Sequence, residues 1–488
     1  MTTRQLFAAL FVVALFTMAV RETLDPDMWW HLRTGQLILE AGIPRYDTFS
    51  FTVPDHEWIT HEWLSQVFMW GLYRIGGLPG LIVGFALLIA LAFWLVYLTS
   101  AGRPFLAAFV LLLAALASAI VWGVRPQIFN LLLTAAFVHV VERYKTKRVS
   151  WRALWLLPLL TILWANLHSG YLLGIVLLGT YTVGEALQRW FSPHDQRTLA
   201  WTAVRSLAFI TAASFLAAVV NPNGPELWIY PFFTLGSQAM QTNILEWQSP
   251  DFHLSYFWPF AAMLFLGIVS WLFSRERPLW SELLLFLGTA AAGLLSARHI
   301  PLFAVVSAPI VARHLLSAFT GSRAYPLLSG RTPEVTLTRT FAALNWAIFL
   351  LALVASGMWT ARKISGNEEA IRKTYPVAAV DFLEEEGLTR ARGYNTYNWG
   401  GYLIWRGVPV FVDGRADVYG DDFLFYYLQT YRLEATWAQP LNDFDVDYVL
   451  MEPTSPLSTL LATSPQWREI YRDDIAQVFV RNEVELQD

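Results

Sequence analysis

An acidic and aromatic segment near the start of the chain carries the residue types most able to do chemistry. Residues 25–33 read Asp-Pro-Asp-Met-Trp-Trp-His-Leu-Arg, and they follow an apolar run over 6–20 that is long enough to enter a bilayer. Ionisable groups are costly beside a membrane, so a cluster of them there often marks a functional site. If this segment lies on the outer face, its carboxylates can act on a molecule presented by the lipid.

Asp25 and Asp27 flank a proline at the start of an expected helix, and two roles are open to them. Both carboxylates could cap the helix by accepting hydrogen bonds from its free N–H groups. Alternatively, one acts as a general base while the other supports it, or the pair holds a divalent cation such as Mg²⁺ or Mn²⁺. Asp27 and His31 share a face of this helix because they are one turn apart.

A second acidic element, His61-Glu62, lies close to the start of another amphipathic segment over 59–72. Glu62 would then work beside Asp27 as a second catalytic carboxylate, with His61 assisting it. The alternative is an ordinary charge at a helix end, with Thr60 as the N-cap.

Composition indicates a polytopic membrane protein. Hydrophobic residues make up 55% of the 488 residues and charged residues 15%, whereas a soluble protein carries about 25% charged residues. The net charge of −4 argues against nucleic acid as a partner. The chain has no cysteine, which excludes disulfides, thiolate nucleophiles and zinc–thiolate sites.

Apolar runs of spanning length predict about eleven transmembrane helices. One set of connecting loops carries 16 Lys and Arg residues and the alternate set six, outside the C-terminal region. The basic side is expected to be cytoplasmic, as is the N-terminus, in a multi-pass protein of the inner or plasma membrane. The runs lie near 5–20, 79–99, 104–122, 126–142, 153–167, 170–187, 203–220, 257–273, 280–296, 300–318 and 340–359.

The chain is thus expected to divide into a transmembrane domain over 1–359 and an external α/β domain over 360–488. The first external loop, 21–78, should contain two helices lying in the membrane interface, over 29–41 and 59–72. An extended stretch over 47–52 joins them.

The C-terminal region has a different composition, with 12 Lys and Arg, 21 Asp and Glu, and no spanning run. Alternating helical and buried extended segments predict one small α/β core. The expected helices are 377–386, 423–431 and 455–462, and the expected strands are 408–412, 446–451 and 476–481.

Polar and aromatic residues on the outer side complete the candidate site. Six of the nine histidines fall there, and polar groups at membrane depth must converge on a partner or a cavity. Arg298 could neutralise a lipid phosphate or simply extend to the interface. The candidate substrate-binding residues are Trp30, His31, Arg33, Asn166, His168, Asn221, Asn223, Glu246, Arg298, His299, Trp399, Tyr402, Asp413 and Arg415.

Two short motifs fill loops of the C-terminal region, and each has a structural alternative. Residues 398–402 read Asn-Trp-Gly-Gly-Tyr and residues 413–417 read Asp-Gly-Arg-Ala-Asp. They could form a rim facing a membrane cavity, or Asp413 and Arg415 could pair to brace the fold. The chain contains no P-loop, no His-Glu-x-x-His, no Gly-x-Gly-x-x-Gly and no Gly-x-Ser-x-Gly.

This layout resembles the GT-C superfamily of membrane glycosyltransferases, with the oligosaccharyltransferase catalytic subunit as the nearest parallel. In that subunit the first external loop has an Asp-Pro followed by aromatics and an arginine, as residues 25–33 do. Its external domain has a Trp-Trp-Asp-Tyr-Gly motif and then another Asp, similar in order to residues 398–402 and Asp413, although Gly400 stands where the motif has its Asp. The chain also resembles bacterial polytopic membrane proteins that share the segment 413–417.

The resemblance implies an outer-face transferase that takes a sugar from a polyprenyl-phosphate carrier embedded among membrane lipids. Asp27 or Asp25 would deprotonate the acceptor hydroxyl or help to hold a cation, and Glu62 and His61 would assist. The carrier phosphate would be bound by three basic residues of the outer turns, Arg298, His299 and His168.

Two other functions remain open. A non-catalytic GT-C-like scaffold, such as an assembly subunit of a membrane complex, is favoured by the missing second Asp-x-Asp motif. A transporter would show broken, charged helices and repeated halves, which this sequence lacks. An enzyme should bring Asp27, Glu62, His168 and Arg298 to one cavity, whereas a scaffold should scatter them.

Overall fold

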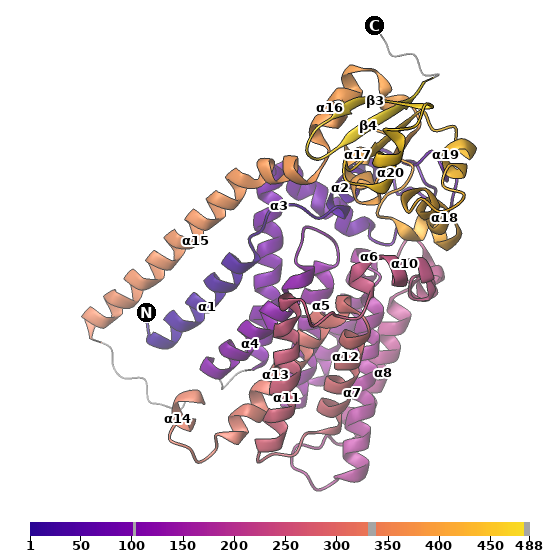
Figure 1. Cartoon of the computed structure of the whole chain (residues 1–488). Coiled ribbons are helices and arrows are strands. Elements are labelled where there is room, and N and C mark those ends of the chain that lie inside the picture. The colour runs from indigo at the N-terminus through magenta and orange to yellow at the C-terminus, as the bar shows by residue number, and fades with distance from the viewer. Residues whose placement is uncertain (101–103, 330–337, 483–488) are drawn as a thin grey trace.

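The computed structural model describes residues 1–100, 104–329 and 338–482 as a bundle of long helices with a smaller α/β module at one end (Figure 1). Each predicted apolar run coincides for most of its length with a helix of this bundle, although the helices over 63–99 and 339–374 extend well beyond their runs. These helices are α1 Thr3–Ala19, α3 Trp63–Thr99, α4 Pro104–Ser118, α5 Ile128–Lys145, α6 Leu156–Leu167, α7 Tyr171–Phe191, α8 Trp201–Ala217, α11 Trp258–Phe273, α12 Trp280–Leu295, α13 Ile300–Ala318 and α15 Arg339–Thr374.

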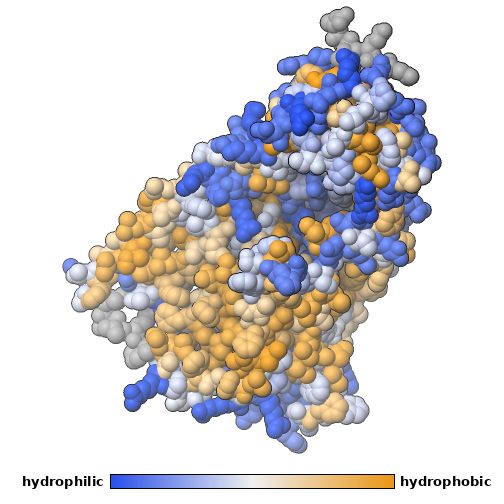
Figure 2. All heavy atoms as spheres, viewed as in Figure 1, coloured by the Kyte–Doolittle hydropathy of each residue, from blue (hydrophilic) through white to orange (hydrophobic). Residues whose placement is uncertain are grey.

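The surface of the bundle is apolar in a broad belt, with hydrophilic residues at both ends (Figure 2). Leu351 and Phe265 are typical of its outward-facing side chains, at 69% and 71% exposed. Within the described residues, four helical segments are long and apolar enough to cross a membrane: Trp63–Thr99, Ser255–Phe273, Ala297–Ala318 and Arg339–Thr374. The shorter apolar helix α1 packs against two of them, α3 and α15, whereas α8 packs against α6 and α7.

The segment between α1 and the bundle proper differs in part from the expectation. The first predicted helix is present as α2, Asp27–Ala41, and it ends at Gly42, whose φ of +92° suits glycine. The second, 59–72, is also present, although it starts at Trp63: α3 consists of two helices that meet at Gly77, whose φ of +59° and ψ of −154° are not helical, and the predicted span 79–99 follows that break. The stretch 47–52 is not a strand, and one of its residues, Ser50, makes an isolated parallel bridge to Val410.

The module contains a four-stranded sheet of order β1-β2-β4-β3, with β1 and β2 parallel and the other pairs antiparallel. Its strands are β1 Gly393–Asn395, β2 Tyr448–Met451, β3 Trp467–Arg472 and β4 Gln477–Arg481. Its helices are α16 Val377–Glu385, α17 Gly400–Trp405, α18 Ala416–Tyr431, α19 Gln439–Asp443 and α20 Pro456–Leu461.

Three features of the module differ from the sequence prediction. The predicted strand 408–412 lies outside the sheet, because Phe411 N–H donates to the Asn395 side chain and Val410 pairs with Ser50 of the first loop. Strands β1 and β3 were not predicted. Helix α15 also runs through the expected boundary at residue 360 and ends at Thr374.

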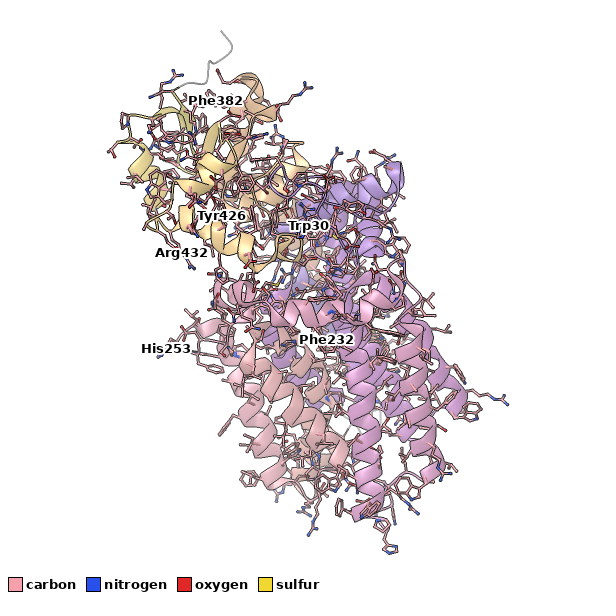
Figure 3. The ribbon with its side chains drawn as sticks, turned by 90° about the vertical axis from the view of Figure 1, so that its right-hand side faces the viewer. Trp30, Phe232, His253, Phe382, Tyr426 and Arg432 are labelled. Carbon is pink, nitrogen blue, oxygen red and sulfur yellow. The ribbon has the colours of Figure 1, made fainter. Side chains whose placement is uncertain are left out.

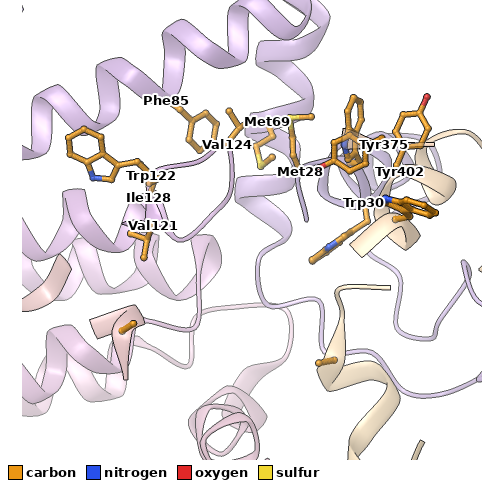
Figure 4. Packing of buried hydrophobic residues seen from close by; sticks show 14 of the residues in the cluster. Met28, Trp30, Met69, Phe85, Val121, Trp122, Val124, Ile128, Tyr375 and Tyr402 are labelled. Carbon is orange, nitrogen blue, oxygen red and sulfur yellow. The ribbon is translucent and has the colours of Figure 1, made fainter. Parts of the chain in front are cut away.

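Aromatic packing seats α2 against the module. The Trp29 ring meets Tyr375 and Tyr402 edge-on, with ring centroids 5.7 and 5.2 Å apart. Met28 of α2 and Met69 of α3 belong to the same buried cluster (Figure 4). The N-terminus of α2, with its two aspartates, is therefore fixed between the bundle and the module.

Candidate active site

A cavity of about 620 Å³ lies where the bundle meets the module. Its walls come from the start of α2, the chain before α3, the turn between α6 and α7, helices α9 (Tyr230–Gly236) and α10 (Gln238–Asn243), and the start of α18. Trp30 marks this junction in Figure 3, with the α9 region around Phe232 on the bundle side. Segments more than 300 residues apart in sequence thus face one space.

The cavity brings together the four residues that were expected to separate an enzyme from a scaffold. Asp27, Glu62, His168 and Arg298 all line it. Five further residues predicted for the site also line it: Trp30, His31, His61, Glu246 and Arg415.

Arg125, which the sequence analysis did not single out, joins three carboxylates at one side of the cavity. Its Nε lies 3.3 Å from Asp25 Oδ2 and its Nη1 lies 3.5 Å from Asp27 Oδ2. It also donates to the carboxylate of Glu246. Arg125 lies just before α5, and its only sequence signal was a cation at the outer end of a predicted span.

Asp27 and Asp25 divide the two roles that the sequence left open. Asp25 Oδ1 accepts a hydrogen bond of 3.1 Å from the Asp27 N–H, and Pro26 is the N-cap of α2. Burial raises the pKa of Asp27 to about 7, and the charge of Asp25 acts in the same direction, while Arg125 and the Trp30 indole N–H oppose it. A carboxylate with a pKa near neutrality suits a general base.

Glu62 is surrounded by three histidines from three elements. Its carboxylate lies 3.2 Å from His168 Nε2, 3.3 Å from His61 Nε2 and 3.6 Å from His31 Nε2. Glu62, and not Thr60, is the N-cap residue of α3, because the Thr60 hydroxyl donates to the Pro44 carbonyl. The charge partners of Glu62 are thus the three histidines, and Glu62 and Asp27 line the same cavity.

Hydrogen bonds assign the protons of this histidine cluster. The Gly170 N–H donates to His168 Nδ1, so the proton of neutral His168 lies on Nε2 and points at Glu62. His61 Nδ1 faces the Ile59 carbonyl while its Nε2 faces Glu62, an arrangement that requires both ring nitrogens to be protonated.

The pKa shifts agree with that assignment. Burial lowers the pKa of His31 to about 3 and that of His168 to about 4, so both are neutral near pH 7. Burial also disfavours charged His61, but Glu62 outweighs it and raises the His61 pKa. Burial would raise the pKa of Glu62, yet the histidines, His61 first, hold it below its usual range.

Arg298 presents a cation to the cavity. Its guanidinium lies over the Trp247 ring, 4.1 Å from the centroid. Within the described part of the chain, no hydrogen bond or ion pair joins it to another side chain. His299 faces a smaller adjoining cavity of about 120 Å³, which Arg298 and His168 also line. The Nδ1 atom of His299 is buried and has no hydrogen-bond partner among the residues that the structure describes.

Tyr230 and Asp417 were also missed by the sequence analysis. The Tyr230 hydroxyl donates to Asp417 Oδ2 at 2.9 Å, and its ring lies 4.3 Å from that of His61. This contact links the module to the histidine cluster. Asp417 lies in the noted segment 413–417, but nothing in its spacing indicates a partner almost 190 residues away.

Several predicted site residues lie outside this cavity and have structural partners. Arg33 bonds Gln36, and Asn166 accepts from the Trp63 indole at 2.7 Å. The Trp399 indole N–H donates to the Thr374 carbonyl, and Tyr402 packs on Trp29. Asn221 and Asn223 form a turn through a bond from the Asn223 N–H to Asn221 Oδ1.

Asp413 and Arg415 brace the fold. Both side chains are fully buried, and Arg415 Nη2 lies 2.7 Å from Asp413 Oδ2. Arg415 Nη1 also reaches Asp47 of the first loop at 2.6 Å. The pair therefore fastens the module to that loop, as the structural alternative expected. Although Arg415 borders the cavity, its guanidinium is already paired with Asp47 and Asp413.

The expected divalent cation has no preformed site in the described residues. No group of three or more His, Asp or Glu side chains there is arranged to hold a metal ion. Arg125 occupies the face that Asp25 and Asp27 share, so a cation could bind them only if Arg125 moved away.

Neither protein-family models nor curated proteins match the chain. Among solved structures, the archaeal oligosaccharyltransferase AglB from Archaeoglobus fulgidus, in complex with an inhibitory peptide and a dolichol-phosphate, aligns with a TM-score of 0.54 and 13% identity over 92% of this chain and 69% of that one. ArnT from Cupriavidus metallidurans, bound to undecaprenyl phosphate, aligns with a TM-score of 0.53 and 16% identity over 97% of both chains. At these identities the likeness concerns the fold, and it confirms the expected one: the chain has a GT-C-like architecture.

Proposed function

We propose that this protein is a membrane glycosyltransferase that moves a sugar from a polyprenyl-phosphate carrier to an acceptor on the outer face. One observation carries the proposal: a single cavity holds both a carboxylate with a near-neutral pKa, Asp27, and an arginine, Arg298, that forms no ion pair with any described residue. Transfer from a phosphate carrier needs a base at the acceptor and a cation at the leaving group.

Different cavity residues act on the acceptor hydroxyl and on the carrier phosphate. Asp27 takes the proton of the acceptor hydroxyl as its oxygen bonds to the sugar, and the bond from the sugar to the carrier phosphate breaks. Arg298 receives the phosphate oxygens that gain charge, and His299, which lines the adjoining cavity together with Arg298 and His168, can add a donor. Glu62 keeps His168 in this tautomer.

The carrier is inferred from the fold and from the bundle surface. The two solved structures with the same fold hold dolichol-phosphate and undecaprenyl phosphate. The apolar belt gives an isoprenoid tail a surface to lie on (Figure 2). In this proposal the bundle spans the inner or plasma membrane about eleven times, and the module and cavity are external. A divalent cation at Asp25 and Asp27 remains an expectation, which transfer with and without a chelator will test.

The test is conversion of a labelled donor by pure protein in lipid nanodiscs. A panel of polyprenyl-phosphate sugars is incubated with an envelope extract as the acceptor source, and released carrier phosphate is counted. We expect turnover of at least one donor, with the rate falling at least about 100-fold in Asp27→Asn. Asp251→Asn, at an exposed aspartate outside the cavity, is the matched control and should keep the activity. Absence of turnover with every carrier would contradict the proposal.

A non-catalytic scaffold is the second candidate, and one observation favours it. Arg125 already pairs with Asp25, Asp27 and Glu246, which is how a purely structural ion cluster is built. Under this alternative Asp27→Asn alters stability or complex assembly but no transfer is found. The donor assay therefore separates the two candidates directly.

A further inference from the structure

A second cavity lies at the opposite end of the bundle from the candidate active site. It has a volume of about 370 Å³ and is lined by the last turn of α5 and by parts of α7, α12 and α13. Helix α5 starts close to Arg125 and has 18 residues, so this basal cavity is about 27 Å from the carboxylates of the first one. It belongs to a different site.

One part of the basal cavity is apolar and opens toward the belt. Leu98, Val306 and Ile310 form this wall. Leu98 is 38% exposed, whereas Val306 is buried. An apolar wall that continues onto a lipid-facing surface can receive a hydrocarbon chain.

The carboxylates at this end are occupied by neighbouring cations. Lys145 Nζ lies 2.9 Å from Glu185 and 3.3 Å from Glu142. Arg313 Nη1 lies 2.7 Å from Glu282. Arg197 is likewise engaged with Asp195 and Glu276. In these ion pairs the cations Lys145, Arg313 and Arg197 are already neutralised by carboxylates of the protein.

Arg143 and Arg148 are different from those cations. Both line the cavity, and both side chains are exposed. Neither guanidinium has a hydrogen bond or ion pair to another side chain among residues 1–100, 104–329 and 338–482. Two unpaired guanidinium groups beside an apolar wall match an amphiphile with an anionic head, because guanidinium binds phosphate oxygens with directed hydrogen bonds.

We propose that the basal cavity binds an anionic phospholipid, with its phosphate between Arg143 and Arg148 and an acyl chain along Leu98. Arg143 lies in the last turn of α5 and Arg148 just beyond its C-terminal end, and Figure 2 shows a hydrophilic rim below the apolar belt, which is the depth at which phospholipid phosphates lie. This site is independent of the transferase proposal, since it shares no residue with the first cavity.

Lipid retention by the full-length protein tests the proposal. Native mass spectrometry of the protein in detergent is used to titrate phosphatidylglycerol, phosphatidylcholine and inorganic phosphate. We expect phosphatidylglycerol to bind in preference to phosphatidylcholine. Its Kd should rise about tenfold or more in the double variant Arg143→Gln, Arg148→Gln. Arg205→Gln is the control, since Arg205 is exposed at the same end but lies outside the cavity.

A further variant tests the apolar half of the site. Leu98→Trp fills the apolar wall while keeping both arginines, so it should weaken phosphatidylglycerol binding and leave inorganic phosphate binding unchanged. Equal binding of the two lipids, or a double variant that binds as the unaltered protein does, would overturn the proposal. Displacement of the lipid by inorganic phosphate at similar concentrations would show a phosphate site without a lipid and would also overturn it.

Discussion

The surroundings of Asp27 bring the pKa of its carboxylate close to neutral pH. Burial raises its pKa to about 7, while Arg125 counters that rise. Only the ionised carboxylate can take a proton, so the transfer rate should increase with pH and reach half its maximum near pH 7. Arg125→Gln removes a charge that lowers the Asp27 pKa, so the profile should move to higher pH. A pH–rate profile with labelled donor measures both, and a shift of the variant to lower pH would refute this role.

Glu62 and His61 form a charge pair whose stabilising effect depends on pH. The pKa of His61 is raised above its usual value of about 6.5 and that of Glu62 is lowered below about 4.3. Both are therefore charged between these values, and the contribution of the pair is lost as pH rises through the raised His61 pKa.

Substitution at Glu62 should reveal this dependence. Glu62→Gln leaves His61 without its partner and should cost roughly 3 kcal/mol at pH 6. The cost should become smaller as the pH is raised from 6 to 9, because the pair loses its contribution as His61 loses its proton. Thermal unfolding in detergent at the two pH values gives the comparison. An equal loss at both would mean that His61 is not charged in the folded protein.

Among the elements, the loop before α18 comes close enough to α2 to set the position of Asp27. A Cβ atom on Gly414 would lie 2.0 Å from Asp27 Oδ1. Gly414→Ala should therefore displace the carboxylate and lower transfer by about 100-fold, while the protein stays folded. Gly366→Ala is the control, since nothing lies within 4 Å of a Cβ there. Donor turnover and thermal unfolding, measured together, separate misplacement from misfolding.

Helices of the bundle could be predicted because each apolar run is long and local. The module was harder, since β1 has three residues and β3 alternates poorly between buried and exposed positions. Residues 408–412 have the apolar character of a strand, yet their backbone bonds a side chain and the first loop. Such partners lie far away in sequence, and no spacing rule indicates them.

The candidate site shows the same division between local and distant information. Its carboxylates and histidines could be listed from the sequence because their residue types are rare beside membrane spans. The contacts between these residues could not be predicted, because the residues that pair are separated by long stretches of chain. Arg125 reaches Glu246 over 121 residues, and Tyr230 reaches Asp417 over 187.

At the scale of the whole molecule, Arg415 holds the module on the first loop. Its removal would leave Asp47 and Asp413 buried without a cation, so Arg415→Met should cost about 3–5 kcal/mol and expose the module to trypsin. Arg406→Met is the matched control, because its carboxylate partners are half exposed and such pairs contribute about 1 kcal/mol or less. Limited proteolysis and thermal unfolding give the result. Equal effects of both variants would contradict this docking role.

The orientation of the molecule decides whether the cavity can serve an outer-face reaction. The chain has no cysteine, so single cysteines can be placed without background. His194→Cys lies in the exposed turn between α7 and α8, and Glu385→Cys lies at the exposed end of α16. If the basic ends of the helices face the cytoplasm, an impermeant maleimide added to sealed right-side-out vesicles should label only Glu385→Cys. After lysis it should label both. Labelling of only His194→Cys before lysis would place the cavity in the cytoplasm and refute an outer-face transferase.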